Sequence, residues 1–249
     1  MSNGGKDRRL VGKSARRIVA AGVLLLAAYP PSRLAAQVGY DPNRSPYHDV
    51  TTTEALTLFY GRFAGARTNA PVGARPGPMV GGRLEVRLTG ALDLWATFAQ
   101  AKSSRNQVVP SDTINRIRPP IQQTLTDVDL ALILNITGAK RWHTLAPYAG
   151  MGMGLIKGPG NQTDPGGFRV GSNFFIAPTI GTRVYLSKAL GLRFEARDYW
   201  LRYEWPLAYY QPTDANNHPV TPVLDQRLST RQVTHNFTLT AGLSYHFTF

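Results

Sequence analysis

Nine charged side chains occupy alternating positions in segments of this sequence that are otherwise rich in aliphatic residues. In residues 83–87, arginine and glutamate alternate with leucine and valine, so an extended chain would place charged and apolar side chains on opposite faces. The nine residues with this parity are Arg83, Glu85, Arg87, Asp93, Asp127, Asp129, Arg193, Glu195 and Arg197. Four are basic and five are acidic, so they can form ion pairs with one another if the fold encloses them.

The sequence offers no recognisable catalytic or metal-binding motif. Its five histidines are at positions 48, 143, 218, 235 and 246, and neither a His-Glu-x-x-His nor a Gly-x-Ser-x-Gly pattern occurs. Ser244 and His246 are two residues apart, and His235 follows Ser229 and Asp225, but no catalytic trio can be assigned from these residues. We therefore predict that the protein is not an enzyme and that it has no cofactor and no metal site.

Residues 237–249 show the clearest strand pattern in the chain. Apolar side chains occupy every odd position from Phe237 to Phe249, and small or polar side chains occupy the even positions. A membrane barrel would place the apolar, aromatic face of such a strand in lipid. The final strand of a water-soluble β-sandwich is the alternative interpretation.

Further strand-like segments precede this one, and their connections alternate between long and short. The eight predicted strands are 54–63, 80–88, 92–102, 125–137, 145–156, 173–186, 191–203 and 231–249. The long connections, rich in glycine, proline and polar residues, are 64–78, 103–124, 157–172 and 204–230. Short connections follow the second, fourth and sixth strands, as an up-and-down barrel requires and a Greek-key sandwich does not. The pattern predicts an all-β fold: an eight-stranded antiparallel up-and-down transmembrane β-barrel.

With this pattern the chain resembles the small eight-stranded outer-membrane β-barrel family of bacteria, typified by the transmembrane domain of outer-membrane protein A and its X-type relatives. The resemblance covers about residues 54–249 and implies a location in the bacterial outer membrane, with outer-membrane lipids as partners. It also implies that the barrel-assembly machinery reads a C-terminal signal formed by Leu243, Tyr245, Phe247 and Phe249. The barrel lipid A deacylases resemble the chain in size, but their His-x-Ser step is reversed here at Ser244 and His246.

The N-terminal residues 1–36 are predicted to be a secretory signal peptide, cleaved near Ala36/Gln37. A basic stretch, an apolar run at 18–28 and a small-residue site follow one another in the required order. Residues 37–53 are polar and rich in turn residues, and we expect them to form a periplasmic lead-in segment before the barrel domain, 54–249. The sequence has no cysteine, which excludes a lipoprotein anchor and disulfides.

The formal net charge of +13 does not predict a nucleic-acid partner. Residues 1–36 carry seven of the 28 basic residues and one of the 15 acidic residues, so 21 − 14 leaves +7 for the rest of the chain. These remaining charges are scattered and are not interleaved with aromatic residues as a nucleic-acid surface would require.

An eight-stranded barrel is just wide enough to be filled by its own side chains. The nine charged residues are therefore expected to form a lumen charge network, and the protein is expected to act as an anchor whose long loops bind surface ligands. Two alternatives remain open: a narrow pore in which the ion pairs exchange partners, and an outer-membrane lipid-modifying enzyme. His235 is expected to be a solvated residue at the outer rim.

Overall fold

The computed structural model describes residues 45–248, and from Pro46 onward the chain forms one compact unit. The predicted signal peptide, residues 37–44 of the predicted lead-in segment and Phe249 lie outside the described residues. The described part is built of β-strands, together with one turn of 3-10 helix, η2 (Leu207–Tyr209). Among residues 45–248, no helix is long and apolar enough to cross a membrane.

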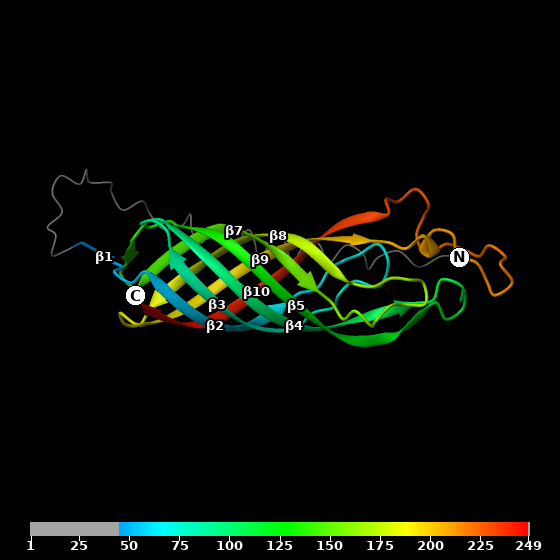
Figure 1. Cartoon of the computed structure of the whole chain (residues 1–249), viewed down its shortest axis with the longest axis horizontal. Helices are drawn as coiled ribbons and strands as arrows, with labels where there is room; N and C mark the ends of the chain where they lie inside the picture. The colour runs from blue at the N-terminus through cyan, green and yellow to red at the C-terminus, as the bar shows by residue number, and fades with distance from the viewer. Residues whose placement is uncertain (1–44, 249) are drawn as a thin grey trace, which may run out of the picture. The chain divides into compact units, whose positions relative to one another are not determined.

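Eight antiparallel strands close into a ring (Figure 1). In order around the ring they are β2 (Glu54–Phe63), β3 (Gly77–Arg87), β4 (Leu92–Val108), β5 (Ile117–Asn135), β7 (Leu145–Lys157), β8 (Ser172–Tyr185), β9 (Leu190–Glu204) and β10 (Arg231–Phe247). The last strand pairs with the first, from Thr238 opposite Phe63 to Phe247 opposite Glu54, which leaves the ring without an open edge. The predicted eight-stranded antiparallel barrel is confirmed.

The connections divide the barrel into two different ends. The short connections 88–91, 136–144 and 186–189 lie at one end, together with the first residue of β2 and the last residue of β10; we call this the turn end. The connections 64–76, 109–116, 158–171 and 205–230 lie at the opposite end, the loop end. In Figure 1 the turn end is on the left, where the C-terminus is marked, and the loops extend to the right.

The wall of the barrel is inverted relative to a water-soluble protein, because its outward face is apolar and its inward face is polar. On β10, Thr234, Asn236 and Thr238 are buried, whereas Phe237 and Leu239 are 57% and 68% exposed. The same alternation exposes a band of leucine, isoleucine, methionine and phenylalanine side chains around the ring. An apolar surface that extends around a whole molecule is unfavourable in water. It is the surface that a transmembrane barrel presents to lipid.

The sequence-based prediction was wrong about two strand boundaries at the loop end, the end of β4 and the start of β5. Residues 103–124 were expected to be a loop, but β4 continues to Val108 and β5 begins at Ile117, so most of this segment is a β-hairpin. A register shift between Arg105 and Gln107 interrupts the hairpin, and Pro119 and Pro120 lie opposite this irregular region. Prolines are tolerated here because this part of the hairpin extends beyond the neighbouring strands and its backbone needs no further partner.

Residues 46–53 form a strap across the turn end of the barrel. At one end of the strap, β1 (Tyr47–Asp49) pairs with β6 (Lys140–Trp142), a short strand in the connection between β5 and β7. At the other end the strap leads into β2, where the Thr53 N–H donates to the Phe247 carbonyl oxygen (3.2 Å). Neither short strand was predicted, because three residues are too few to show a periodic pattern.

Candidate functional site

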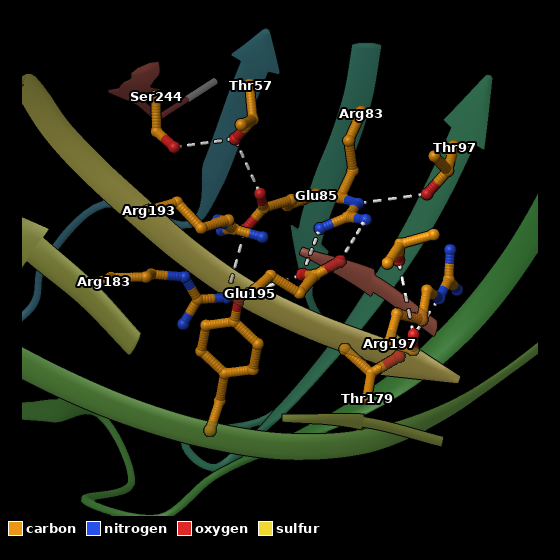
Figure 2. A network of polar contacts seen from close by, with 12 residues as sticks. Thr57, Arg83, Glu85, Thr97, Thr179, Arg183, Arg193, Glu195, Arg197 and Ser244 are labelled. Atoms are coloured by element: carbon orange, nitrogen blue, oxygen red, sulfur yellow. Dashed lines mark hydrogen bonds and ion pairs between the residues drawn. The ribbon is translucent and has the colours of Figure 1, made fainter. Parts of the chain in front are cut away.

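The centre of the lumen is an ion pair between opposite sides of the ring. Arg83 on β3 donates two hydrogen bonds to Glu195 on β9, at 2.6 and 2.8 Å, and both side chains are buried (Figure 2). The Tyr148 hydroxyl donates to the same carboxylate (2.9 Å), and Arg83 Nε donates to the Thr97 hydroxyl (3.0 Å). This two-point arginine–carboxylate geometry is the strong form of such a pair.

A second cluster lies between this pair and the turn end. Arg183 on β8 bridges two carboxylates, with Nη2 at 2.6 Å from Asp93 and 3.1 Å from Glu85. Arg193 also donates to Glu85, and Glu85 in turn accepts a hydrogen bond from the Thr57 hydroxyl (2.9 Å), which contacts Ser244 (Figure 2). The Thr57 hydroxyl thus satisfies the one Glu85 oxygen that the two arginines leave free.

A third cluster lies between the central pair and the loop end. Arg197 donates two hydrogen bonds of 2.7 Å to Asp129, and Tyr199 donates one of 2.9 Å to Asp127. Gly152 makes room for the arginine, because a Cβ at this position would lie 2.2 Å from Arg197 Nη2.

Aromatic rings separate the arginines of the lumen. The guanidinium carbons of Arg83 and Arg193 lie 4.3 and 4.4 Å from the ring centroid of Trp95, which packs edge-on against Tyr148. Cation–π contacts of this kind stabilise cations that are removed from water. The lumen is therefore filled by interlocked charged and aromatic side chains.

The structure brings all nine predicted residues into the lumen and adds a tenth. Arg87 lies at the edge of the network, with Nε 3.7 Å from Asp93 Oδ1. Sequence reasoning missed Arg183, although it has the same parity as the buried Thr179 and Tyr185 on β8. Including Arg183 changes the count from four arginines and five carboxylates to five of each, so the formal charges of the network cancel.

An apolar cap covers the lumen at the loop end. Side chains from three long loops pack with inward residues of the strands in one buried cluster that includes Val72, Phe168, Tyr209 and Leu224. Phe168 packs against Tyr203, Trp205 and Tyr209, with centroid distances of 5.5 to 6.4 Å. The loops thus form a packed structure over the barrel mouth, and their backbone is held by that packing.

A buried ion pair ties the cap to the wall. Arg105 Nη1 on β4 donates to Asp164 in the connection 158–171 (2.7 Å), and the Val108 N–H donates to the same carboxylate (3.2 Å). Arg105 continues the inward parity of β4 beyond the predicted strand, so extending the pattern would have found it, whereas Asp164 lies in an aperiodic loop. Burial, together with the neighbouring Asp164 carboxylate, raises the pKa of Tyr209 above its ordinary value, so this ring stays neutral.

The strap lies across the other end of the lumen. Arg87 Nη1 donates to the Val50 carbonyl oxygen (2.7 Å), and the Arg87 N–H donates to the Thr53 carbonyl oxygen (2.8 Å). A small pocket of about 20 Å³, about the size of one water molecule, lies beside the strap, between Thr53, Glu85, Asp93, Arg183 and His246.

The histidines do not assemble a catalytic trio with the partners considered from sequence. His246 is buried in the lumen, where its ring packs against Tyr185. His235 lies on the outward face and contacts Asp198 (Nδ1 to Oδ2, 2.7 Å) instead of Ser229 or Asp225. Asp198 also accepts hydrogen bonds from Trp200 Nε1 (2.7 Å) and the Asn236 N–H (3.1 Å). Within the described part of the chain, His235 and Asp198 contact no serine or threonine hydroxyl.

The residues of the predicted C-terminal assembly signal lie on the outward face of β10. Leu243 and Tyr245 are 53% and 54% exposed, Phe247 is half-buried and stacks on Tyr245, and Phe249 is outside the described residues. An apolar and aromatic stripe therefore runs down β10 to the turn end. The architecture is that of a transmembrane β-barrel.

Solved structures to which the chain is similar are small bacterial outer-membrane proteins. The outer membrane protein OprG from Pseudomonas aeruginosa matches with a TM-score of 0.49 and 9% identity, over 82% of this chain and 100% of that chain. Neisserial surface protein A matches with a TM-score of 0.47 and 11% identity, over 82% and 98%. The outer membrane protein AlkL matches with a TM-score of 0.44 and 15% identity, over 80% and 92%. No protein-family model and no curated protein matches the sequence.

Proposed function

We propose that this protein is a non-enzymatic outer-membrane anchor: a closed barrel that holds a packed set of loops at the cell surface. The observation that carries the proposal is the sealed lumen. Five arginines and five carboxylates fill its middle, the apolar cap covers the loop end, and the strap crosses the turn end. In this orientation the turn end faces the periplasm and the loop end faces the outside.

The packed loops are the candidate interaction surface. Their inner residues form the apolar cap, and their outer residues, such as Ile114, Leu207 and Leu228, are exposed at 89%, 69% and 41%. Arg116 on the β4–β5 hairpin donates to the carbonyl oxygens of Thr221 and Pro222 in the longest loop (2.6 and 3.0 Å), which joins two loops into one surface. A surface built this way presents exposed apolar residues on a fixed support, as a protein or glycan ligand would require.

The test is electrical recording from the purified protein in planar lipid bilayers. A sealed lumen predicts no stable current steps, in the parent protein or in an Arg83→Gln/Glu195→Gln variant, because the cap and the strap remain. Regular steps from the parent protein would contradict the anchor and support the narrow pore. Heat-dependent mobility on a gel, in the same preparation, verifies that the barrel is folded.

We further propose that the chain is exported through a signal peptide cleaved near Ala36/Gln37, and that the barrel-assembly machinery recognises its C-terminal residues. The outward stripe of Leu243, Tyr245 and Phe247 supports this role. Replacing Phe249 with Ser should lower the amount of barrel assembled in cells, while refolding of the purified chain into lipid should be unchanged. Equal assembly of both chains in cells would contradict a role for Phe249.

A further inference from the structure

The outer face of the wall carries a groove of about 530 Å³ between β8 and β9 at the loop end. The part of the groove nearer the turn end is apolar and includes Phe174, Ile176 and Trp200. The part nearer the loop end is polar and includes Ser172, Arg202 and Glu204. The groove exists because the two strands separate here. The pairing of β8 with β9 ends with Phe175 opposite Leu201. Beyond this point, toward the loop end, β8 pairs only with β7 and β9 only with β10, within the described residues.

Cations surround the polar part of the groove. Arg202 and Arg231 both contact Glu204, at 3.5 and 3.1 Å, so the single carboxylate cannot neutralise both. Lys157 on β7 lies opposite Ser172 in the ladder, on the outward face, and no ion pair within residues 45–248 involves it. Three cations and one carboxylate therefore flank the groove, with a net charge of +2.

The groove marks the level at which the apolar band ends. On β9 the outward residues change from Phe194 and Trp200 to Arg202, and on β7 they change from Leu155 to Lys157. An exposed tryptophan (Trp200, 40%) next to cations is the composition expected where a lipid bilayer meets water. Long basic side chains at this level can reach headgroups while their stems stay against apolar surface.

We propose that this groove binds a lipid with an anionic, phosphate-bearing headgroup, an inference that rests on the membrane location proposed above. The acyl chain would lie against Phe174, Ile176 and Trp200, and the phosphate between Lys157 and Arg202. A lipid is the occupant that fits because the groove is continuous with the apolar band and its cations are in excess. Asp198, the nearby outward carboxylate, contacts Trp200 Nε1, the Asn236 N–H and His235 but none of the three cations, and counting its charge lowers the local sum from +2 to +1, which is still positive.

The test uses Trp200 as the reporter. Trp95 and Trp205 are buried, so replacing Trp142 with Phe leaves Trp200 as the exposed tryptophan among the described residues. The Trp142→Phe protein is inserted into phosphatidylcholine vesicles that contain a small fraction of brominated lipid, either phosphatidylglycerol or phosphatidylcholine. The proposal predicts that brominated phosphatidylglycerol quenches Trp200 several-fold more strongly at equal fractions.

Two charge-matched variants then test whether the preference for phosphatidylglycerol depends on the groove. Lys157→Gln/Arg202→Gln should lower the preference for phosphatidylglycerol by roughly fivefold per cation removed. Arg62→Gln/Lys102→Gln removes the same charge from outward positions on β2 and β4, away from the groove, and should keep the preference. Equal losses in both variants would overturn the groove site in favour of general surface attraction.

The controls separate this proposal from the membrane location itself. Equal quenching of the Trp142→Phe protein by the two brominated lipids would overturn the lipid site and leave the barrel in its membrane. An absence of quenching by either lipid would show that the wall is not in contact with lipid, and the anchor function would fall as well.

Discussion

Individual residues of the lumen act in groups that depend on one another. Glu85 is held by Arg183, Arg193 and Thr57, and Arg183 also holds Asp93, so Glu85 and Arg183 each have partners on at least two strands. A buried charge whose partner is removed cannot regain water, which makes single substitutions more damaging than the loss of the whole pair.

Replacing Arg83 with Met should lower the free energy of unfolding by about 3–5 kcal/mol, because Glu195 would keep its charge in the lumen without its direct ion pair. The measurement is urea unfolding of the protein in lipid vesicles, followed by tryptophan fluorescence. The Arg83→Met/Glu195→Met double variant should recover most of the stability. The exposed Arg231→Met should cost less than about 1 kcal/mol. A single variant as stable as the parent would contradict the role of the pair.

Gly152 is a second residue on which the network depends. A methyl group there would displace the Arg197 guanidinium from Asp129, so Gly152→Ala should lower the free energy of unfolding by about 1–3 kcal/mol. The same urea titration measures it. Gly160, around which nothing lies within 4 Å, provides the matched control, and Gly160→Ala should be nearly neutral. Equal stabilities of the two variants would show that Arg197 can move without cost.

At the scale of residues, the sequence predicted the lumen charges wherever the alternation of a strand showed which side chains face inward. Nine lumen charges follow from alternation alone, because any strand whose outward face is aliphatic must turn its charges inward. Arg183 was missed because the segment 173–186 carries apolar residues of both parities, such as Phe174 and Phe175, and therefore gives no clear face.

At the scale of elements, the loop end is more ordered than loop composition suggests. The β4–β5 hairpin extends beyond the ring, and the connection 158–171 is fixed to it by Arg105 and Asp164. The sequence predicted a loop at 103–124 because its glutamines, asparagines and prolines weaken the strand signal. Tertiary contacts that stabilise the hairpin come from residues distant in sequence, which a local pattern cannot contain.

Replacing Asp164 with Asn should loosen the cap without opening the ring. The Arg105 guanidinium would lose a charged acceptor, at a cost of about 1–3 kcal/mol, so cleavage within 158–171 by an added protease should be about ten to a hundred times faster. Mass spectrometry of the fragments measures the rate and site. Asp214→Asn, in an exposed turn of loop 205–230, is the control. Unchanged cleavage would show that apolar packing alone holds the loop.

For the whole molecule, eight strands and their order could be predicted because lipid on one side and a polar interior on the other impose strict alternation. The closure of the lumen could not be predicted. It depends on the strap, of which only three residues pair with another strand, and on the cap, which combines aromatic residues from separate loops. Both are contacts between distant segments, and both decide whether the barrel is a channel.

The strap also has a consequence for the rate of folding. Tyr47–Asp49 pairs with Lys140–Trp142, whereas the ring closes by the pairing of β2 with β10, in which residues 46–49 take no part. We expect a chain that lacks residues 46–49 to close its ring at the parental rate, as measured by the gel shift during refolding, but to admit small thiol reagents to a cysteine placed at Thr57. A slower shift would mean instead that the N-terminal segment guides the closure of the ring.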